Sequence, residues 1–132
     1  MRRVLIPSVF LFAVGCQAAP PRAAVPPLAE DSAPLPFTEL VSRARQQAMT
    51  ALEAYYVDRW AEVEEAARGL EQTTRFLRRS TAVPTARQGD LSLRADALAE
   101  AAKQLREAAK SRASEQVNSV LQRINAQVRE LR

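Results

Sequence analysis

Apolar residues recur at three- and four-residue steps from position 38 to the end of the chain. This spacing places side chains on one face of an α-helix. Four such stripes can be traced. They consist of Val41, Ala44, Ala48, Leu52 and Tyr55; of Trp60, Val63, Ala67, Leu70, Thr74 and Leu77; of Leu98, Ala102, Leu105 and Ala109; and of Val117, Leu121, Ile124, Val128 and Leu131. The pattern predicts an all-α domain, with Thr38 as the N-cap of its first helix.

Changes in the phase of the stripes predict where helices end. The stripe through Ala109 would next reach Arg112, but the following stripe begins at Val117. A turn over residues 110–114, with Ser111 or Ser114 as a cap, accounts for the change. A loop is expected over residues 80–89, which contain a proline and a glycine, before a helix capped by Asp90 or Ser92.

A further change of phase lies between Tyr55 and Trp60, with Asp58 as the capping residue. This break predicts an antiparallel, up-down four-helix bundle over residues 37–132, with the 80–89 loop in the middle. The alternative is three helices with a very long first one over residues 38–79, because a continuous stripe can also be traced through this region.

The first residues have the features of an export signal. Met1-Arg2-Arg3 is positively charged, and an apolar segment of 11 residues follows, which is too short to span a bilayer. Leu11-Phe12-Ala13-Val14-Gly15-Cys16 resembles a bacterial lipobox, with alanine where leucine is usual. The resemblance implies a signal peptide over residues 1–15, lipidation of Cys16, and anchoring on the periplasmic or outer face of a membrane. The alternative is an ordinary secretory signal cut near Ala18-Ala19.

Residues 16–36 are expected to form a linker after the lipidated cysteine. Of the twenty residues 17–36, six are prolines and six are alanines. Proline lacks an amide donor and has a fixed φ angle, so neither a helix nor a central strand is expected. An extended spacer at ~3.1 Å per residue would reach up to ~60 Å from the membrane. A tail without a spacing role is the alternative.

The composition excludes several kinds of chemistry. The chain has no histidine and one cysteine, so it can form neither an internal disulfide nor a Cys/His metal site. It also lacks a glycine-rich phosphate loop and a serine-nucleophile motif. Without Arg2 and Arg3, 17 basic residues stand against 15 acidic ones and alternate with them. We therefore expect no catalysis, no metal, no cofactor and no nucleic-acid partner.

The predicted layout over residues 38–132 resembles the cytochrome c-prime superfamily, whose antiparallel four-helix bundles hold haem near the end of the last helix. The diagnostic Cys-x-x-Cys-His motif of that family is missing. Val128 and Leu131 stand where its cysteines would be, and Arg132 stands where its histidine would be. The resemblance therefore implies a haem-free relative, in which Val128 and Leu131 are core residues.

Two surface patches are candidates for binding. Tyr55, Tyr56 and Trp60 gather most of the aromatic surface near the first predicted turn, where they would pack locally or contact a protein partner.

Arg75, Arg78 and Arg79 lie at the predicted end of a helix, where cations favour the helix dipole or bind anionic lipid or an acidic partner. Glu62, Glu64, Glu65 and Arg68 form a charged cluster, in which Glu64 and Glu65 lie four and three residues before Arg68 and are expected to form solvated pairs with it.

The hypothesis that fits these features is a non-catalytic, membrane-tethered interaction or scaffold module of the cell envelope, with an envelope protein as partner. The alternative is a carrier of an apolar ligand or of non-covalent haem. The sequence leaves the oligomeric state open.

Overall fold

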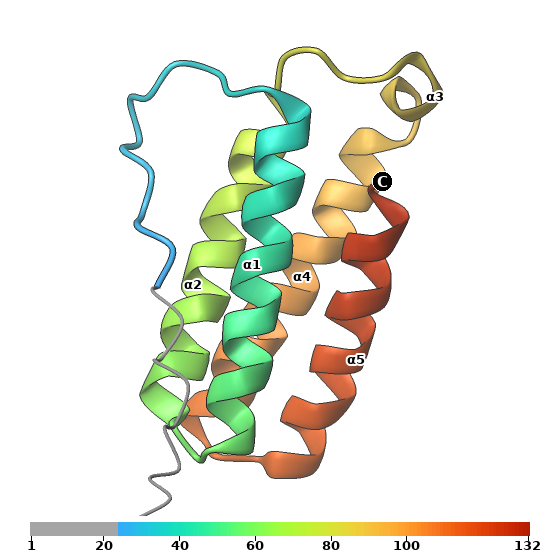
Figure 1. Cartoon of the computed structure of the whole chain (residues 1–132). Coiled ribbons are helices and arrows are strands. Elements are labelled where there is room, and N and C mark those ends of the chain that lie inside the picture. The colour runs from blue at the N-terminus through green and yellow to red at the C-terminus, as the bar shows by residue number, and fades with distance from the viewer. Residues whose placement is uncertain (1–23) are drawn as a thin grey trace, which may run out of the picture.

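The computed structural model describes residues 24–132, and helices make up most of this range (Figure 1). The long helices are α1 (Phe37–Tyr56), α2 (Trp60–Leu77), α4 (Leu91–Lys110) and α5 (Ser114–Glu130), and the short α3 is Thr85–Gln88. The described residues contain no strand, only an isolated bridge between Pro36 and Thr81. The prediction of an all-α protein is confirmed.

Each long helix packs against two others. Contacts join α1 to α2, α2 to α4, α4 to α5, and α5 back to α1. The connections between successive long helices lie at alternate ends of this body (Figure 1). The alternative of a single first helix over residues 38–79 is wrong, because α1 ends at Tyr56 and α2 begins at Trp60.

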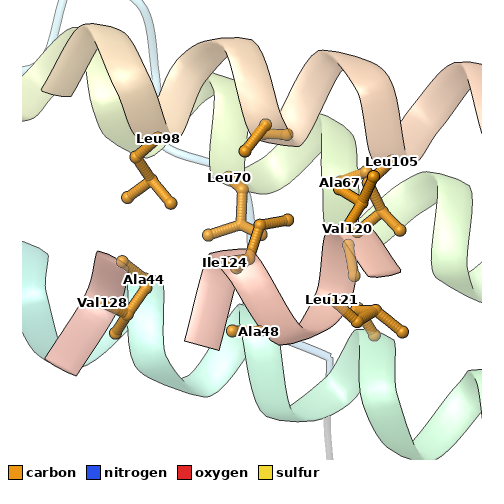
Figure 2. Close-up of a cluster of buried hydrophobic side chains, with 14 of the residues drawn as sticks. Ala44, Ala48, Ala67, Leu70, Leu98, Leu105, Val120, Leu121, Ile124 and Val128 are labelled. Carbon is orange, nitrogen blue, oxygen red and sulfur yellow. The ribbon is translucent and has the colours of Figure 1, made fainter. Parts of the chain in front are cut away.

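The predicted stripes form the core. Every stripe residue is buried except Leu52, Tyr55 and Trp60, which are half-buried. In Figure 2, leucines of α2 and α4 and apolar residues of α5 point to a common interior, which α1 lines with Ala44 and Ala48. Eleven of the 27 buried hydrophobic residues are alanines, so the helices can approach one another closely.

The helix ends differ from several of the predicted caps. Thr38 lies inside the first turn of α1, which begins at Phe37 with Pro36 as its N-cap. Proline suits this position because its fixed φ angle, here −60°, leads into the helix. The N-cap of α5 is Ala113, so neither serine of the 110–114 turn caps that helix.

The 80–89 segment also holds a short helix that the sequence pattern did not predict, α3. Asp90 occupies the N-cap position of α4, but its carboxylate bonds Arg94 at 2.5 Å instead of a backbone amide. That hydrogen bond holds the pKa of Asp90 below its ordinary value. Arg94 also reaches Glu130 of α5 at 2.8 Å and so links the two helices.

The turns after α1 and α4 end their helices in the same way. Asp58 adopts a left-handed conformation with φ 57°, so it terminates α1 instead of capping α2. The amides of Asp58 and Arg59 then bond the carbonyls of Tyr55 (3.2 Å) and Ala54 (2.9 Å), which is a Schellman motif. Arg112, with φ 52°, repeats this arrangement after α4.

Among the described residues, no helix combines the length and the apolar character needed to cross a bilayer.

Candidate functional site

Residues 24–36, which we call the N-terminal strap, lie along the outside of α1 and α2 (Figure 1). The side chain of Gln72 on α2 bonds both backbone groups of Leu28. Its Oε1 accepts from the Leu28 amide at 2.9 Å, and its Nε2 donates to the Leu28 carbonyl at 2.7 Å. One glutamine thus pairs with the strap as a neighbouring strand would. The half-buried Leu28 side chain packs against the core.

Glu30 forms a second point of attachment. Its carboxylate pairs with Arg75 at 2.8 Å and accepts a longer bond from Gln72 Nε2 at 3.4 Å. Its carbonyl accepts from Arg79 Nη2 at 3.2 Å. These contacts hold the middle of the strap to the last turns of α2.

The strap is attached at both of its ends as well. The Thr81 amide donates to the Leu35 carbonyl at 3.0 Å, and the Phe37 amide donates to the Thr81 carbonyl at 2.9 Å. Near the other end, Arg43 of α1 donates to the carbonyl of Pro26. The prediction of a spacer over residues 17–36 is therefore wrong for residues 24–36, which contain a turn at residues 29–32 and are bound to the helices.

The direction of the strap follows from its neighbours. Ala24 and Val25 border a cavity that Glu62 and Glu65, in the first turns of α2, also line. Glu30 contacts Arg79, just beyond the end of the same helix. The strap therefore runs parallel to α2, and the described chain begins about halfway along α1 and α2 (Figure 1).

The three arginines at the end of α2 have separate intramolecular contacts. Arg75 and Arg79 bind Glu30, and Arg78 pairs with Asp96 of α4. Arg79 also lies over the ring of Phe76, 4.2 Å from its centroid. The geometry gives these arginines structural partners within the chain, and the predicted anion or lipid patch stays a prediction.

The structure brings the three predicted aromatic residues together where α1 meets α2. The Tyr55 ring lies 5.8 Å from that of Tyr56 and 5.9 Å from that of Trp60, the latter edge to face. The Tyr55 hydroxyl shares a 2.8 Å hydrogen bond with the Ser114 hydroxyl, at the start of α5. This bond places the α1–α2 turn beside the α4–α5 turn.

The aromatic residues differ in exposure. Tyr55 and Trp60 are half-buried, whereas Tyr56 is 73% exposed. Val57, which follows directly, is 59% exposed. The sequence analysis did not include Val57, because this residue belongs to none of the apolar stripes. An apolar residue outside every stripe is expected to point away from the core, and this could have identified Val57. We call Tyr55, Tyr56, Val57 and Trp60 the aromatic end.

A small cavity lies between the strap, α1 and α2. Its volume is about 130 Å³, below the ~300–1,000 Å³ of typical ligand pockets. Gln47, only 4% exposed, lines it and accepts a 2.8 Å hydrogen bond from Thr73 on its Oε1. Gly69 leaves room for this amide, since a Cβ there would lie 2.7 Å from Gln47 Nε2. The periodic pattern gave no signal for this buried polar pair.

A larger surface groove, about 620 Å³, runs between α1 and α5. Its lining combines three apolar residues with three arginines and two amides: Met49, Leu52, Val128, Arg45, Arg129, Arg132, Gln122 and Asn125. No carboxylate side chain is among its lining residues. The groove is open to solvent and lies outside the packed core.

The predicted carboxylate–arginine pairs are confirmed. Arg68 contacts Glu65 at 2.8 Å and Glu64 at 3.2 Å, and Glu62 pairs instead with Arg59 at 3.3 Å. Residues 24–132 hold no group of three or more His, Cys, Asp or Glu side chains that could bind a metal ion. Cys16 and the predicted signal peptide lie outside the described residues.

No match for this chain was found among protein-family models, curated proteins or solved structures. Val128 is 4% exposed and Leu131 1% exposed, so both are core residues. The resemblance to the cytochrome c-prime superfamily stays a prediction.

Proposed function

We propose that this chain is a lipid-anchored, non-catalytic interaction or scaffold module of the bacterial cell envelope. Lipid on Cys16 holds an antiparallel, up-down four-helix bundle at a membrane. The observation that carries the proposal is the N-terminal strap, which binds residues 24–36 to the helices. Because only eight positions separate Cys16 from Ala24, that stretch spans at most ~25 Å, against the ~60 Å expected of the whole linker.

The bundle assignment is supported by the cyclic order of helix contacts and by ion pairs between neighbouring helices. Glu71 of α2 accepts from Arg106 of α4 at 2.8 Å, and both side chains are about three-quarters buried. Removing one partner of such a pair leaves the other charge poorly solvated, so the pair favours one arrangement of the two helices.

The side-chain chemistry supports a non-catalytic role. The whole chain has no histidine, and its only cysteine is the one assigned to the anchor. The acidic cluster at the start of α2 is engaged by arginines at the surface, as the Glu64–Arg68 and Glu65–Arg68 pairs illustrate. Solvated pairs of this kind contribute to helix stability, which accounts for these carboxylates without a catalytic role.

Membrane fractionation combined with intact-mass measurement tests the anchor. We expect the natural protein in the membrane fraction, with acyl chains on an N-terminal Cys16. The Cys16→Ser variant should be soluble and should keep its helical circular dichroism. A matched control adds Ser32→Cys to that variant, which restores a thiol within the strap but no lipobox, and it should also stay soluble. A natural protein that is soluble, or that begins after Cys16, would refute the proposal.

The interaction partner is tested separately. Crosslinking in native membranes, followed by purification under denaturing conditions, should recover an envelope protein bound to this chain. Recovery of the monomer alone would contradict a protein-binding role and leave the anchored module without its proposed partner.

The groove between α1 and α5 favours a second candidate function, a carrier of an apolar ligand. Its three apolar and three arginine lining residues suit an amphiphile with a negatively charged head. Native mass spectrometry of the purified protein should then detect a bound amphiphile, and Met49→Glu should abolish it. A natural protein that carries no added mass would argue against this candidate.

A further inference from the structure

Four large hydrophobic residues in the described chain are exposed, and two of them are consecutive. Tyr56 and Val57 lie at the turn between α1 and α2. The preceding residue, Tyr55, is half-buried, whereas these two side chains are exposed. The hydrogen bond between Tyr55 and Ser114 places the α4–α5 turn next to them. Exposing a tyrosine and a valine together does not stabilise the helices, so this pair needs another explanation.

The strap runs toward this end of the helical body when it is traced back from Phe37. The described chain begins at Ala24, which borders a cavity lined by Gln47 and Gly69, about halfway along α1 and α2 (Figure 1). Helix α1 has 20 residues and is ~30 Å long at 1.5 Å per residue, so the aromatic end lies ~15 Å further on. The eight positions from Cys16 to Ala24 span up to ~25 Å, which lets the anchor reach the level of the aromatic end.

The residues at this end suit the boundary between lipid and water. Tyrosine and tryptophan favour that boundary because each combines an apolar ring with a polar group. Between the helices, the two turns carry Arg59 and Arg112 against Asp58, and Arg59 also pairs with Glu62 at 3.3 Å. Cations at a membrane surface are attracted to anionic headgroups.

A protein partner fits this patch less well than a bilayer does. A stable protein interface buries ~1,200–2,000 Å² in total, which two exposed apolar side chains do not supply. A bilayer to which the same chain is anchored is present at high effective concentration, so a small contact suffices.

We propose that the aromatic end is the membrane-docking surface of this domain. Tyr56 and Val57 enter the headgroup region of the bilayer that holds the Cys16 anchor, and the long helices stand away from the membrane. This inference rests on the proposed lipid anchor.

The sole tryptophan of the chain, Trp60, reports on the docking directly. The lipidated protein is reconstituted into phosphatidylcholine–phosphatidylglycerol vesicles whose acyl chains are either brominated or not, since bromine quenches nearby tryptophan. We expect weaker Trp60 emission in the brominated vesicles. Replacing Tyr56 and Val57 by serine together should reduce that loss. The matched control is Leu93→Ser, which removes an equally exposed hydrophobic residue (73%) near the start of α4, at the opposite end, and should leave the loss unchanged.

A second arm separates this inference from the anchor itself. The unlipidated full chain is coupled through Cys16, its only cysteine, to a maleimide lipid in the same vesicles. Trp60 quenching in this arm supports the docking surface even if cells do not lipidate the chain. Equal Trp60 emission in both vesicle types, in either arm with a verified anchor, would overturn the inference. So would a double-serine variant that keeps its quenching but loses a crosslinked protein partner, because the patch would then serve that protein.

Discussion

The substitution Gln72→Ala provides a sharp test of the strap. It removes both hydrogen bonds between the Gln72 amide and the backbone of Leu28, at 2.9 and 2.7 Å. Each bond contributes about 0.5–1.5 kcal/mol net, so together they stabilise the docked strap by about 1–3 kcal/mol. Since 1.4 kcal/mol corresponds to tenfold, the equilibrium for strap opening should rise by roughly 5- to 150-fold.

Hydrogen exchange followed by mass spectrometry measures this change. In the natural protein the Leu28 amide is protected by its bond to Gln72. In the Gln72→Ala variant, peptides covering the strap should exchange faster by the factor above, while peptides from α4 and α5 keep their rates. Because the strap buries few side chains, it can open while the helices stay folded. Faster exchange in the strap alone therefore reports local opening, whereas global unfolding would also raise exchange in α4 and α5.

Gln104→Ala is the matched control, because Gln104 lies on α4 and bonds Glu100 and Arg123 instead of the strap. It should leave exchange in the strap unchanged. If Gln72→Ala also leaves the exchange of Leu28 unchanged, the strap is not held by this glutamine. Residues 24–36 would then not be held to the helices by Gln72, and the connection to Cys16 would not be shortened by this contact.

Two further changes test the interior and a helix end. Thr73→Val leaves the buried Oε1 of Gln47 without its donor and should lower the free energy of unfolding by about 1–3 kcal/mol in denaturant titrations. Thr50→Val removes a half-buried hydroxyl of α1 that donates to the Gln46 carbonyl in its own helix, and it should change the free energy of unfolding by less than about 0.5 kcal/mol. Equal effects of the two substitutions would contradict a special role for the buried pair. Arg112→Gly should raise the free energy of unfolding by roughly 0.5–1 kcal/mol, because φ is 52° there and glycine adopts that conformation without strain. Lys103→Gly, inside α4, should lower the free energy of unfolding by about 1 kcal/mol. If both glycine variants unfold at a lower temperature than the natural protein, the left-handed conformation of Arg112 is refuted.

The strap changes the geometry expected of the proposed envelope module. A free linker of twenty residues would let the domain move far from the membrane in any orientation. Binding residues 24–36 to α1 and α2 leaves only eight positions between Cys16 and Ala24, and the strap, traced back from Phe37, leads toward the aromatic end. A short connection in this direction favours the proposed docking of the aromatic end on the membrane.

Only part of the candidate site could be predicted from the sequence. Tyr55, Tyr56 and Trp60 were predicted to be neighbours because all three lie within six positions of one another at a helix end. The sequence did not separate the inward-facing Tyr55 from the exposed Tyr56, nor did the prediction include Val57. That separation depends on α5, since Ser114 bonds Tyr55 from 59 positions away.

The helices and most of the core were determined by the sequence alone. Burial on one face requires apolar residues at a spacing near 3.6, and a helix break shifts the phase of that spacing, as it does before Val117. Both signals are local, so they can be detected without knowing what a helix packs against. The choice between one and two helices over 38–79 was settled only by the structure, where Asp58 turns the chain with a positive φ.

The tertiary structure decided the fate of the proline-rich segment. Its proline content excludes a helix and a central strand there. It does not determine whether that backbone is free or bound to the helices. The binding comes from Gln72, 44 positions beyond Leu28, and from Arg75 on the next turn. Such contacts join single polar groups that are far apart in the chain, and they leave no periodic pattern. Only the folded arrangement of α1 and α2 brings them together and converts a predicted spacer into part of the domain.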